Sequence, residues 1–370
     1  MSHADEQWKR AMTAEQQRLD ILRLATLIAL VGVLVFLGAI SIVNRVGFEE
    51  PTDGVTWARR GDSLVAVGVA ADGPGARAGL LQGDRLARIG GITVQSPAPD
   101  LVDEELWARG IGARLEYDVE RGSATVSALL AVGGRPVGYR SYLYLCFVGV
   151  AFLIAGLFAL LREREGSAGR RFFWLALAFY AVLVLSPTAE SDSFFRAIFW
   201  VDDTARMALP GLFLYFALTF PQPKSTYLRH RTGWLLGAFG PGLLLWLIDA
   251  TLLIGDTDIP LLKATKTSIL QFNSNLGLVY FAAALGAGVL LLAHSYKVTT
   301  SPIERKRLKW LVGGSALGVV PFIVIYVPLF LLGITRAALI DLAVLPFLFV
   351  PLSFGYAAVC FRLWDVELIL

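Results

Sequence analysis

The sequence predicts an α-helical integral membrane protein with about eight transmembrane helices and one inserted extracytoplasmic α+β domain. Of its 370 residues, 56% are hydrophobic and 17% are charged, whereas soluble domains are about 45–50% apolar and about a quarter charged. The apolar residues gather in blocks of about twenty, which is the length that crosses the hydrocarbon core of a bilayer as a helix. The stretch between the first two blocks has the composition of a soluble domain, which indicates an insertion.

Eight apolar segments are predicted to span the membrane, because a helix satisfies its own backbone hydrogen bonds in lipid. They run 22–43, 141–161, 172–188, 205–220, 233–254, 271–294, 310–333 and 338–360. The first is longer than the apolar core of a signal peptide and Ser41 to Asn44 offers no small-x-small cleavage site, so we expect a retained signal anchor. The expected domains are 1–21 as a cytoplasmic N-terminal segment, 22–43 as the first transmembrane helix, 44–138 as the inserted domain, 139–361 as a seven-helix module and 362–370 as the start of a cytoplasmic helix.

The basic residues of the short loops predict the orientation. The N-terminal segment with Arg23, the loops 162–171, 221–232 and 295–309, and Arg362 together hold 17 Lys and Arg residues, while the alternate short loops with Arg206 hold 5. Lys and Arg are enriched in cytoplasmic loops. We therefore expect both termini in the cytoplasm and 44–138 on the other side of the membrane.

Charge and cysteine content exclude several classes of partner and cofactor. A formal net charge of +3 is too balanced to suggest nucleic-acid binding. Cys146 and Cys360 are the two cysteines, both in apolar runs far apart in sequence, which argues against a disulfide scaffold and against a zinc or iron–sulfur site. We expect no metal and no other cofactor.

The inserted stretch shows strand and turn signals. Alternation at 55–58 and a turn at 60–62 lead into a strand at 63–69, and a second hairpin is predicted from 114–120 and 124–130 around Arg121 and Gly122. A helix is predicted over 99–109, with acidic residues near its N-terminal end.

A short motif lies between these elements. It consists of Ala78, Gly79 and Leu80, two further residues, and then Gly83 and Asp84. We expect Ala78 and Gly79 to let a short helix pack closely on the sheet, Gly83 to adopt a backbone conformation that hinders side chains, and Asp84 to bond amides of the following turn. The run resembles the PDZ family in the circular form common in bacterial envelope proteins.

The PDZ resemblance implies a groove that takes an extended peptide as an added strand. We place this groove between the 63–69 strand and the helix near 101–107, where the candidate contacts are Arg59, Arg60, Ser63, Val65 and Trp107. The two arginines would attract a terminal carboxylate, whereas Asp62 would oppose it. A structural or docking role without peptide capture remains an equal alternative.

Polar residues of the multi-span part collect near the outer ends of the predicted helices. The candidate ligand contacts there are Asp249, Asn273, Asn275 and Asp341, and Asp202 and Asp203 have a similar position. One interpretation is an outward-facing ligand pocket. The other is ordinary interfacial solvation with hydrogen bonds between helices.

Three stretches at the cytoplasmic edge carry a second resemblance. They are 216–224, 304–314 and 356–370, and the last contains Arg362, Leu363, Trp364 and Asp365 at the exit from the membrane. In this order they resemble the input region of bacterial sensor histidine kinases, a group that includes the competence quorum-sensing kinase of bacilli, which has a PDZ-like domain after its first span. A similar region occurs on membrane-bound serine phosphatases. Cys360 departs from the pattern, since a basic or polar residue is frequent there.

The resemblance implies a receptor in the bacterial cytoplasmic membrane that detects an extracytoplasmic or membrane-borne signal. It also implies a homodimer, a peptide or small-molecule signal, a cytoplasmic catalytic region beyond this chain, and a response regulator as partner. His3, His230 and His294 are the only histidines and none has a phospho-acceptor context. We therefore expect no catalytic residue in the chain itself.

Two other classes remain as alternatives. An intramembrane protease with a PDZ domain would need H-E-x-x-H, which is absent, or a serine and histidine pair. Gly313 to Ala316 and His294 supply those residue types in the order opposite to that of rhomboid proteases, and the small residues favour close helix packing instead. A transporter would favour repeats or broken helices around a midplane site, and we find no convincing repeat.

Overall fold

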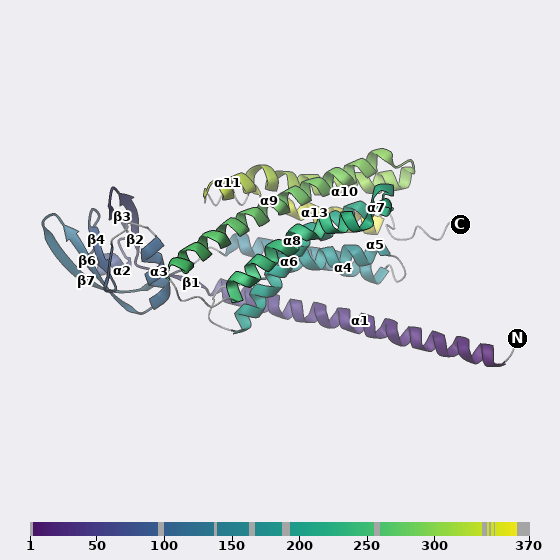
Figure 1. The fold of residues 1–370 in the computed structure, drawn as a ribbon, viewed down its shortest axis with the longest axis horizontal. Helices are drawn as coiled ribbons and strands as arrows, with labels where there is room; N and C mark the ends of the chain where they lie inside the picture. The colour runs from purple at the N-terminus through teal and green to yellow at the C-terminus, as the bar shows by residue number, and fades with distance from the viewer. Residues whose placement is uncertain are drawn as a thin grey trace. The chain divides into compact units, whose positions relative to one another are not determined.

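The chain divides into two compact units, each with its own hydrophobic core. The computed structural model describes residues 3–94, 100–136, 139–162, 167–186, 193–254, 260–334, 339, 342–343 and 345–360. The smaller unit, Val46–Gly138, is built mainly of antiparallel strands. The larger unit, Met1–Arg45 with Tyr139–Leu370, is built of helices (Figure 1).

The smaller unit, called the sheet unit below, has one main antiparallel sheet. Its strands lie side by side in the order β2 (Val55–Arg60), β3 (Ser63–Val69), β4 (Arg85–Ile89), β6 (Arg114–Arg121) and β7 (Ala124–Ala131). The short β5 (Ile92–Thr93) pairs with β4, and β1 (Glu49–Thr52) forms a separate ribbon with β8 (Gly133–Pro136). The two helices are α2 (Pro74–Arg77) and α3 (Asp100–Arg109). The predicted strands, hairpin turns and helix of this region are confirmed.

Glycine positions explain how α2 lies close to the sheet. A Cβ on Gly75 would lie 2.5 Å from Val55 Cγ2 and 2.9 Å from the Asp53 carbonyl oxygen, so only glycine fits there. Gly79 meets open space instead, and its φ of +85° ends the helix in the left-handed region. The predicted packing role of Gly79 was therefore wrong, whereas Gly83, with φ of +98°, has the conformation expected of it.

Asp84 anchors the turn between α2 and β4. It is 1% exposed, and its carboxylate accepts hydrogen bonds from Arg121 Nε at 2.8 Å, Arg121 Nη2 at 2.7 Å and the Leu81 amide at 2.8 Å. The sequence predicts that Asp84 bonds amides of the turn that follows it. The amide that it bonds, that of Leu81, precedes it in the chain instead. The hydrogen bond from Arg121 outweighs burial and holds the pKa of Asp84 below its ordinary value. Ala78 and Leu80 of the same motif pack on the core of the sheet unit.

The larger unit, called the helical unit, contains long helices joined by short connections. They are α1 (His3–Val46), α4 (Arg140–Arg162), α5 (Ser167–Val184), α6 (Ser193–Thr219), α7 (Ser225–Arg229), α8 (Arg231–Ile254), α9 (Pro260–Val298), α10 (Pro302–Pro321), the π-helix η1 (Phe322–Tyr326), α11 (Val327–Leu331), the 3-10 helix η2 (Leu345–Leu348) and α13 (Phe349–Cys360). In the described residues α6 contacts α5, α8 and α9, and α10 contacts α9 and α13.

Five helical segments of the described residues are long and apolar enough to cross a membrane. They are Ala25–Val46, Arg140–Leu161, Arg231–Leu253, Ser268–Val298 and Pro302–Leu331. The other predicted spans, 172–188, 205–220 and 338–360, overlap α5, α6 and the pair η2 and α13. Charged residues at the start of α5 and in the first half of α6 shorten the apolar runs of those two helices. The helical membrane character is thus supported, while the count of eight spans stays a prediction.

Glycines and prolines shape the C-terminal helices. A Cβ on Gly314 would collide with Ser353, and one on Gly318 with Val350, so these glycines let α10 and α13 pack closely as predicted. Prolines lie where the helix type changes. Pro321 ends α10 before the π-helix, Pro328 begins α11 and Pro346 lies in η2.

We predict that Asp84→Ala destabilises the sheet unit by about 2 kcal/mol, because Arg121 and the Leu81 amide lose a buried acceptor. Since the folded pKa of Asp84 is depressed, its contribution is present above the pKa of an unfolded aspartate and is lost as the pH falls through the folded value. Hydrogen exchange of β3, β4 and β6 in the full chain measures both effects. The exposed Asp62→Ala is the control, and equal protection in the two variants would contradict the prediction.

Candidate functional site

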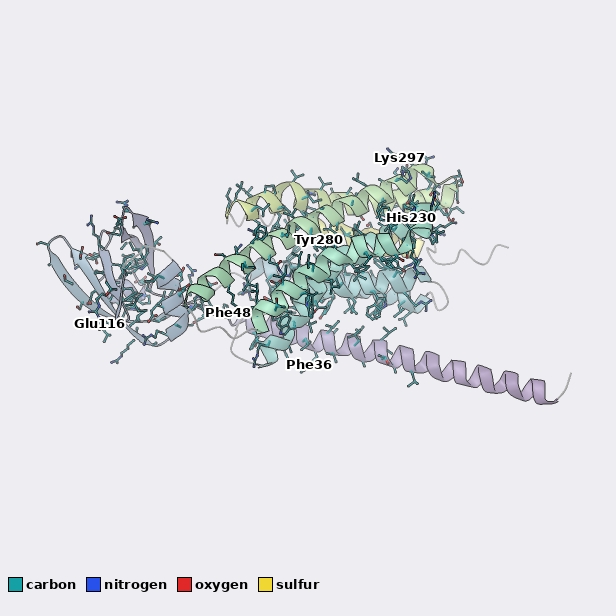
Figure 2. The ribbon with its side chains drawn as sticks, viewed as in Figure 1. Phe36, Phe48, Glu116, His230, Tyr280 and Lys297 are labelled. Carbon is teal, nitrogen blue, oxygen red and sulfur yellow. The ribbon has the colours of Figure 1, made fainter. Side chains whose placement is uncertain are left out.

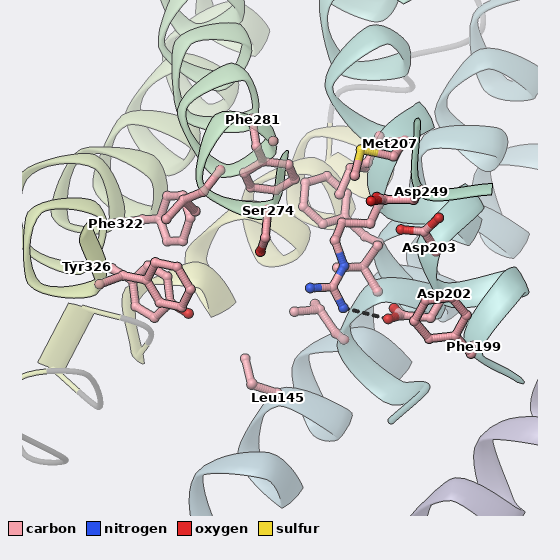
Figure 3. Close-up of a pocket in the computed structure, with 18 of the residues that line it drawn as sticks. Leu145, Phe199, Asp202, Asp203, Met207, Asp249, Ser274, Phe281, Phe322 and Tyr326 are labelled. Carbon is pink, nitrogen blue, oxygen red and sulfur yellow. Dashed lines mark hydrogen bonds and ion pairs between the residues drawn. The ribbon is translucent and has the colours of Figure 1, made fainter. Parts of the chain in front are cut away.

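The helical unit contains a partly open cavity of about 670 Å³ between α4, α5, α6, α8, α9 and the η1–α11 segment (Figure 3). Its volume lies in the range of about 300–1,000 Å³ that is typical of small-molecule sites. Most of the wall is aliphatic or aromatic. Among the described residues, the charged side chains in the wall are Asp202, Asp203, Arg206 and Asp249.

Three carboxylates of the wall are buried, with 3% exposure for Asp202, 7% for Asp203 and 9% for Asp249. Asp202 and Arg206 are one helical turn apart on α6, and Arg206 Nη2 donates to Asp202 Oδ2 at 2.5 Å, which is the dashed line in Figure 3. Asp203 of α6 lies beside Asp249 of α8 in the same view. Within the described part of the chain, Asp202 Oδ1 and Asp203 Oδ2 have no hydrogen-bond partner.

The close packing of α6 on α8 brings these acids together. Gly242 lies against the carbonyl oxygen of Met207, where a side chain would not fit. About one turn before Met207 on α6, the Thr204 hydroxyl accepts a hydrogen bond from Trp246 Nε1 of α8 at 3.1 Å. The two antiparallel helices are therefore in register where Asp203 and Asp249 meet.

An irregular helix forms the opposite wall. Phe322 and Tyr326 of η1 line the cavity and stack with ring centroids 5.0 Å apart. Phe322 also contacts Phe281 of α9 at 5.6 Å and Phe347 of η2 at 5.3 Å. Single-turn π-helices of this kind are frequent at functional sites.

Of the four ligand contacts predicted in the multi-span part, the structure places one in the cavity wall. Asp249 lines the cavity. Asn273 is buried and donates from Nδ2 to the Leu245 carbonyl oxygen at 3.1 Å, so it joins α9 to α8, which is the hydrogen-bonding alternative. Asn275 accepts from Gln271 Nε2 at 3.3 Å on the same helix and is not part of the cavity wall. Asp341 lies outside the described residues.

Asp202, Asp203 and Arg206 were not among the candidate contacts. The signal was present as two aspartates with an arginine one turn later in an apolar setting. The predicted span began at 205, and this boundary assigned the aspartates to the membrane surface. In the structure α6 starts at Ser193, so the cluster lies well inside the helix.

The predicted peptide groove of the sheet unit stays a prediction. β3, Ser63–Val69, pairs with β2 along its length and with β4 only at Leu64 and Val65, so both of its edges are paired at these two residues. The strand at this side of the sheet is β2. Arg59 and Arg60 end β2 at the hairpin turn and are exposed, and Arg59 Nε donates to the Gly61 carbonyl oxygen at 3.2 Å. Ser63 begins β3 and Val65 is buried in it.

The loop before β2 is bonded internally. Asp53 is buried and accepts hydrogen bonds from Trp57 Nε1 at 2.8 Å, the Tyr117 hydroxyl at 3.0 Å and the Val55 amide at 2.9 Å. Burial, together with the Asp53 carboxylate, raises the pKa of Tyr117. The Gly54 amide donates to Thr52 Oγ1 at 3.0 Å. The amides of Gly54 and Val55 are thus both bonded to side chains of the same loop.

Two further groups of predicted residues can be placed. Trp107 of α3 is 52% exposed and stacks on Phe48, which is labelled in Figure 2, at 6.1 Å. The predicted exit residues Arg362, Leu363, Trp364 and Asp365 lie outside the described residues. In the part of the chain that the structure describes, no group of three His, Cys, Asp or Glu side chains is arranged to hold a metal ion.

Comparison with known proteins does not assign the chain to a family. No family model matches the sequence, and no curated protein matches it. Among solved structures, the chain is similar to an HtrA-type protease, AlgW, with a decapeptide, at 23% identity and a TM-score of 0.25. The match covers 28% of this chain and 35% of that one, and a likeness this slight assigns neither fold nor function.

We predict that Arg206→Gln lowers the Tm of the protein in nanodiscs by about 5 °C or more, because Asp202 loses its partner in an apolar setting. Adding Asp202→Asn to this variant should recover at least half of the loss, since the uncompensated charge is then removed. The control is Arg196→Gln, at an exposed position of the same helix. Equal Tm values for Arg206→Gln and Arg196→Gln would show that the ion pair between Asp202 and Arg206 does not stabilise the fold.

Proposed function

We propose that the chain is the membrane receptor and input module of a two-component histidine kinase, as its cytoplasmic-edge motifs suggest. It would detect an extracytoplasmic or membrane-borne signal and relay it to a cytoplasmic catalytic region. The observation that carries this proposal is a ligand-sized cavity that shares its wall with the last helices. Two buried carboxylate oxygens in this wall have no hydrogen-bond partner in the part of the chain that the structure describes. The input region of a membrane-bound serine phosphatase is the alternative within the same class.

A continuous set of contacts connects the cavity to α13. Phe322 of the wall packs edge-on against Phe347 of η2, which continues directly into α13. Gly314 and Gly318 hold α10 against α13 beyond this point, and Trp310 contacts Tyr356 with ring centroids 4.7 Å apart. A ligand that favours one packing of these helices over another would therefore move the helix that leads to residues 361–370.

The proposal includes the finer features expected from the sequence. These are eight membrane spans with both termini in the cytoplasm of a bacterium, residence in its cytoplasmic membrane, and a PDZ-like extracytoplasmic domain over 44–138. The partners would be the lipid bilayer, a peptide or small-molecule signal, a second copy of the chain and a cytoplasmic response regulator. The distribution of basic residues between alternate loops supports the orientation.

A transporter is a second candidate that one observation favours. The helical wall of the cavity is interrupted by the π-helix η1, and transporters place their substrate sites beside broken helices. Uptake of a labelled cavity ligand into proteoliposomes would support this candidate. Binding without uptake would favour the receptor.

We predict that Asp203→Asn with Asp249→Asn changes the basal autophosphorylation of a chimera by about fivefold or more. The chimera joins residues 1–370 to the dimerisation and catalytic regions of a histidine kinase. Neutralising the acids removes the charge that a bound ligand would compensate, so the helices should redistribute between their packings. Phe347→Ala should abolish this change because it breaks the contact between the cavity wall and α13.

The matched control is Asp62→Asn, which removes an exposed acid of the sheet unit and should leave autophosphorylation unchanged. Membrane insertion and expression are compared by immunoblotting. Unchanged autophosphorylation in the double aspartate variant, or the same change with and without Phe347→Ala, would refute the receptor function.

A further inference from the structure

We infer that the cavity binds an organic cation, in which a protonated amine or quaternary ammonium group is carried on an apolar body. The inference rests on the proposed function in that it names the ligand class of the same site. It does not depend on which output domain follows the chain.

The balance of charges in the cavity wall indicates that the ligand is positively charged. Among the described residues of the wall, Asp202, Asp203 and Asp249 face a single guanidinium, that of Arg206. When all are ionised, two negative charges therefore have no counter-charge in the described part of the wall. Two carboxylate oxygens, Asp202 Oδ1 and Asp203 Oδ2, are buried without a hydrogen-bond partner in the described residues. Unpaired buried carboxylates are strongly unfavourable. A bound cation would supply both the charge and the missing donors, whereas an anion would add repulsion.

The remaining wall argues for an organic ligand over a metal ion. Ca²⁺ takes six to eight oxygen ligands within about 2.6 Å, and the described residues contain no cluster of three acidic or other metal-ligating side chains suited to an ion. The volume of about 670 Å³ is far larger than one ion fills. Most of that space is bounded by hydrocarbon, which favours a ligand with a sizeable apolar part.

Aromatic rings also line the cavity. Figure 3 shows Phe199 beside Asp202, with Phe281, Phe322 and Tyr326 on the far wall. Rings attract ammonium groups through their π-electron faces and also cover apolar groups well. The combination of carboxylates on α6 and α8 with rings on η1 and α9 therefore fits a ligand that is cationic at one end and apolar at the other.

Three probes of similar shape and different charge test the inference. They are 4-phenylbutylammonium, 4-phenylbutan-1-ol and 4-phenylbutanoate, titrated calorimetrically into the full chain in phosphatidylcholine nanodiscs, with empty nanodiscs subtracted. We expect saturable binding of the amine, at least about tenfold tighter than that of the alcohol, and no saturable binding of the carboxylate. Equal affinity for amine and alcohol, or preference for the carboxylate, would overturn the inference.

Variants assign the effect to the acids. Asp203→Asn with Asp249→Asn should weaken amine binding by about tenfold or more and leave the alcohol unaffected. Asp62→Asn, which removes an exposed acid of the sheet unit, should preserve the amine preference. If the double variant does not assemble, Asp249→Asn alone should reduce the preference for the amine over the alcohol. The comparison of the three probes on the unmodified chain still decides whether the ligand is cationic. Full amine affinity in an assembled double variant would refute the assignment.

This experiment separates the ligand class from the proposed function. If the chain binds the amine but the cavity variants do not affect the kinase chimera, the ligand is an organic cation and the proposed receptor function is wrong. A chimera that responds to those variants, in a chain that does not prefer the amine, would keep the receptor and reject the cation.

Discussion

The burial of three carboxylates beside one arginine in an apolar helical bundle is the constraint on which the rest of the helical unit depends. Removing such charges from water is expensive unless they are paired and hydrogen-bonded. Arg206 satisfies part of Asp202 from the next turn of α6, but Asp202 Oδ1 and Asp203 Oδ2 stay without partners among the described residues. A bundle that keeps these groups must be stabilised elsewhere, and a ligand that satisfies them gains affinity for the same reason.

Close helix packing supplies that stability. Gly242 seats α8 on α6, and the hydrogen bonds from Trp246 to Thr204 and from Asn273 to the Leu245 carbonyl fix the two neighbours of α8 around it. The Tyr280 hydroxyl, labelled in Figure 2, donates to the Ala238 carbonyl oxygen further along the same interface. The irregular wall formed by η1 is joined to α13 through Phe347. The acids therefore lie between the closely packed helices α6, α8 and α9 on one side and the π-helix η1 on the other.

Local sequence patterns predicted the elements and the hairpin pairs well, but not the contacts between elements that are distant in the chain. Alternation and turn residues placed β2, β3, β6 and β7, because these signals lie within each segment. They could not show that β3 is interior, since strand order depends on distant pairings. Gly79 and Gly75 illustrate the same limit, because close approach depends on Val55 and Asp53, which a local motif does not reveal. Likewise, Asp203 and Asp249 meet only through the register of α6 and α8, and the two span boundaries gave no sign of it.

A structure of the full chain in nanodiscs, determined with and without 4-phenylbutylammonium, tests the central claim most directly. We expect the ammonium nitrogen within about 3 Å of carboxylate oxygens of Asp203 and Asp249, with the phenyl ring against Phe322 and Tyr326. A cavity filled by a lipid chain in both structures, with the aspartates turned away or paired with another basic side chain, would contradict the claim that these acids await a cationic ligand.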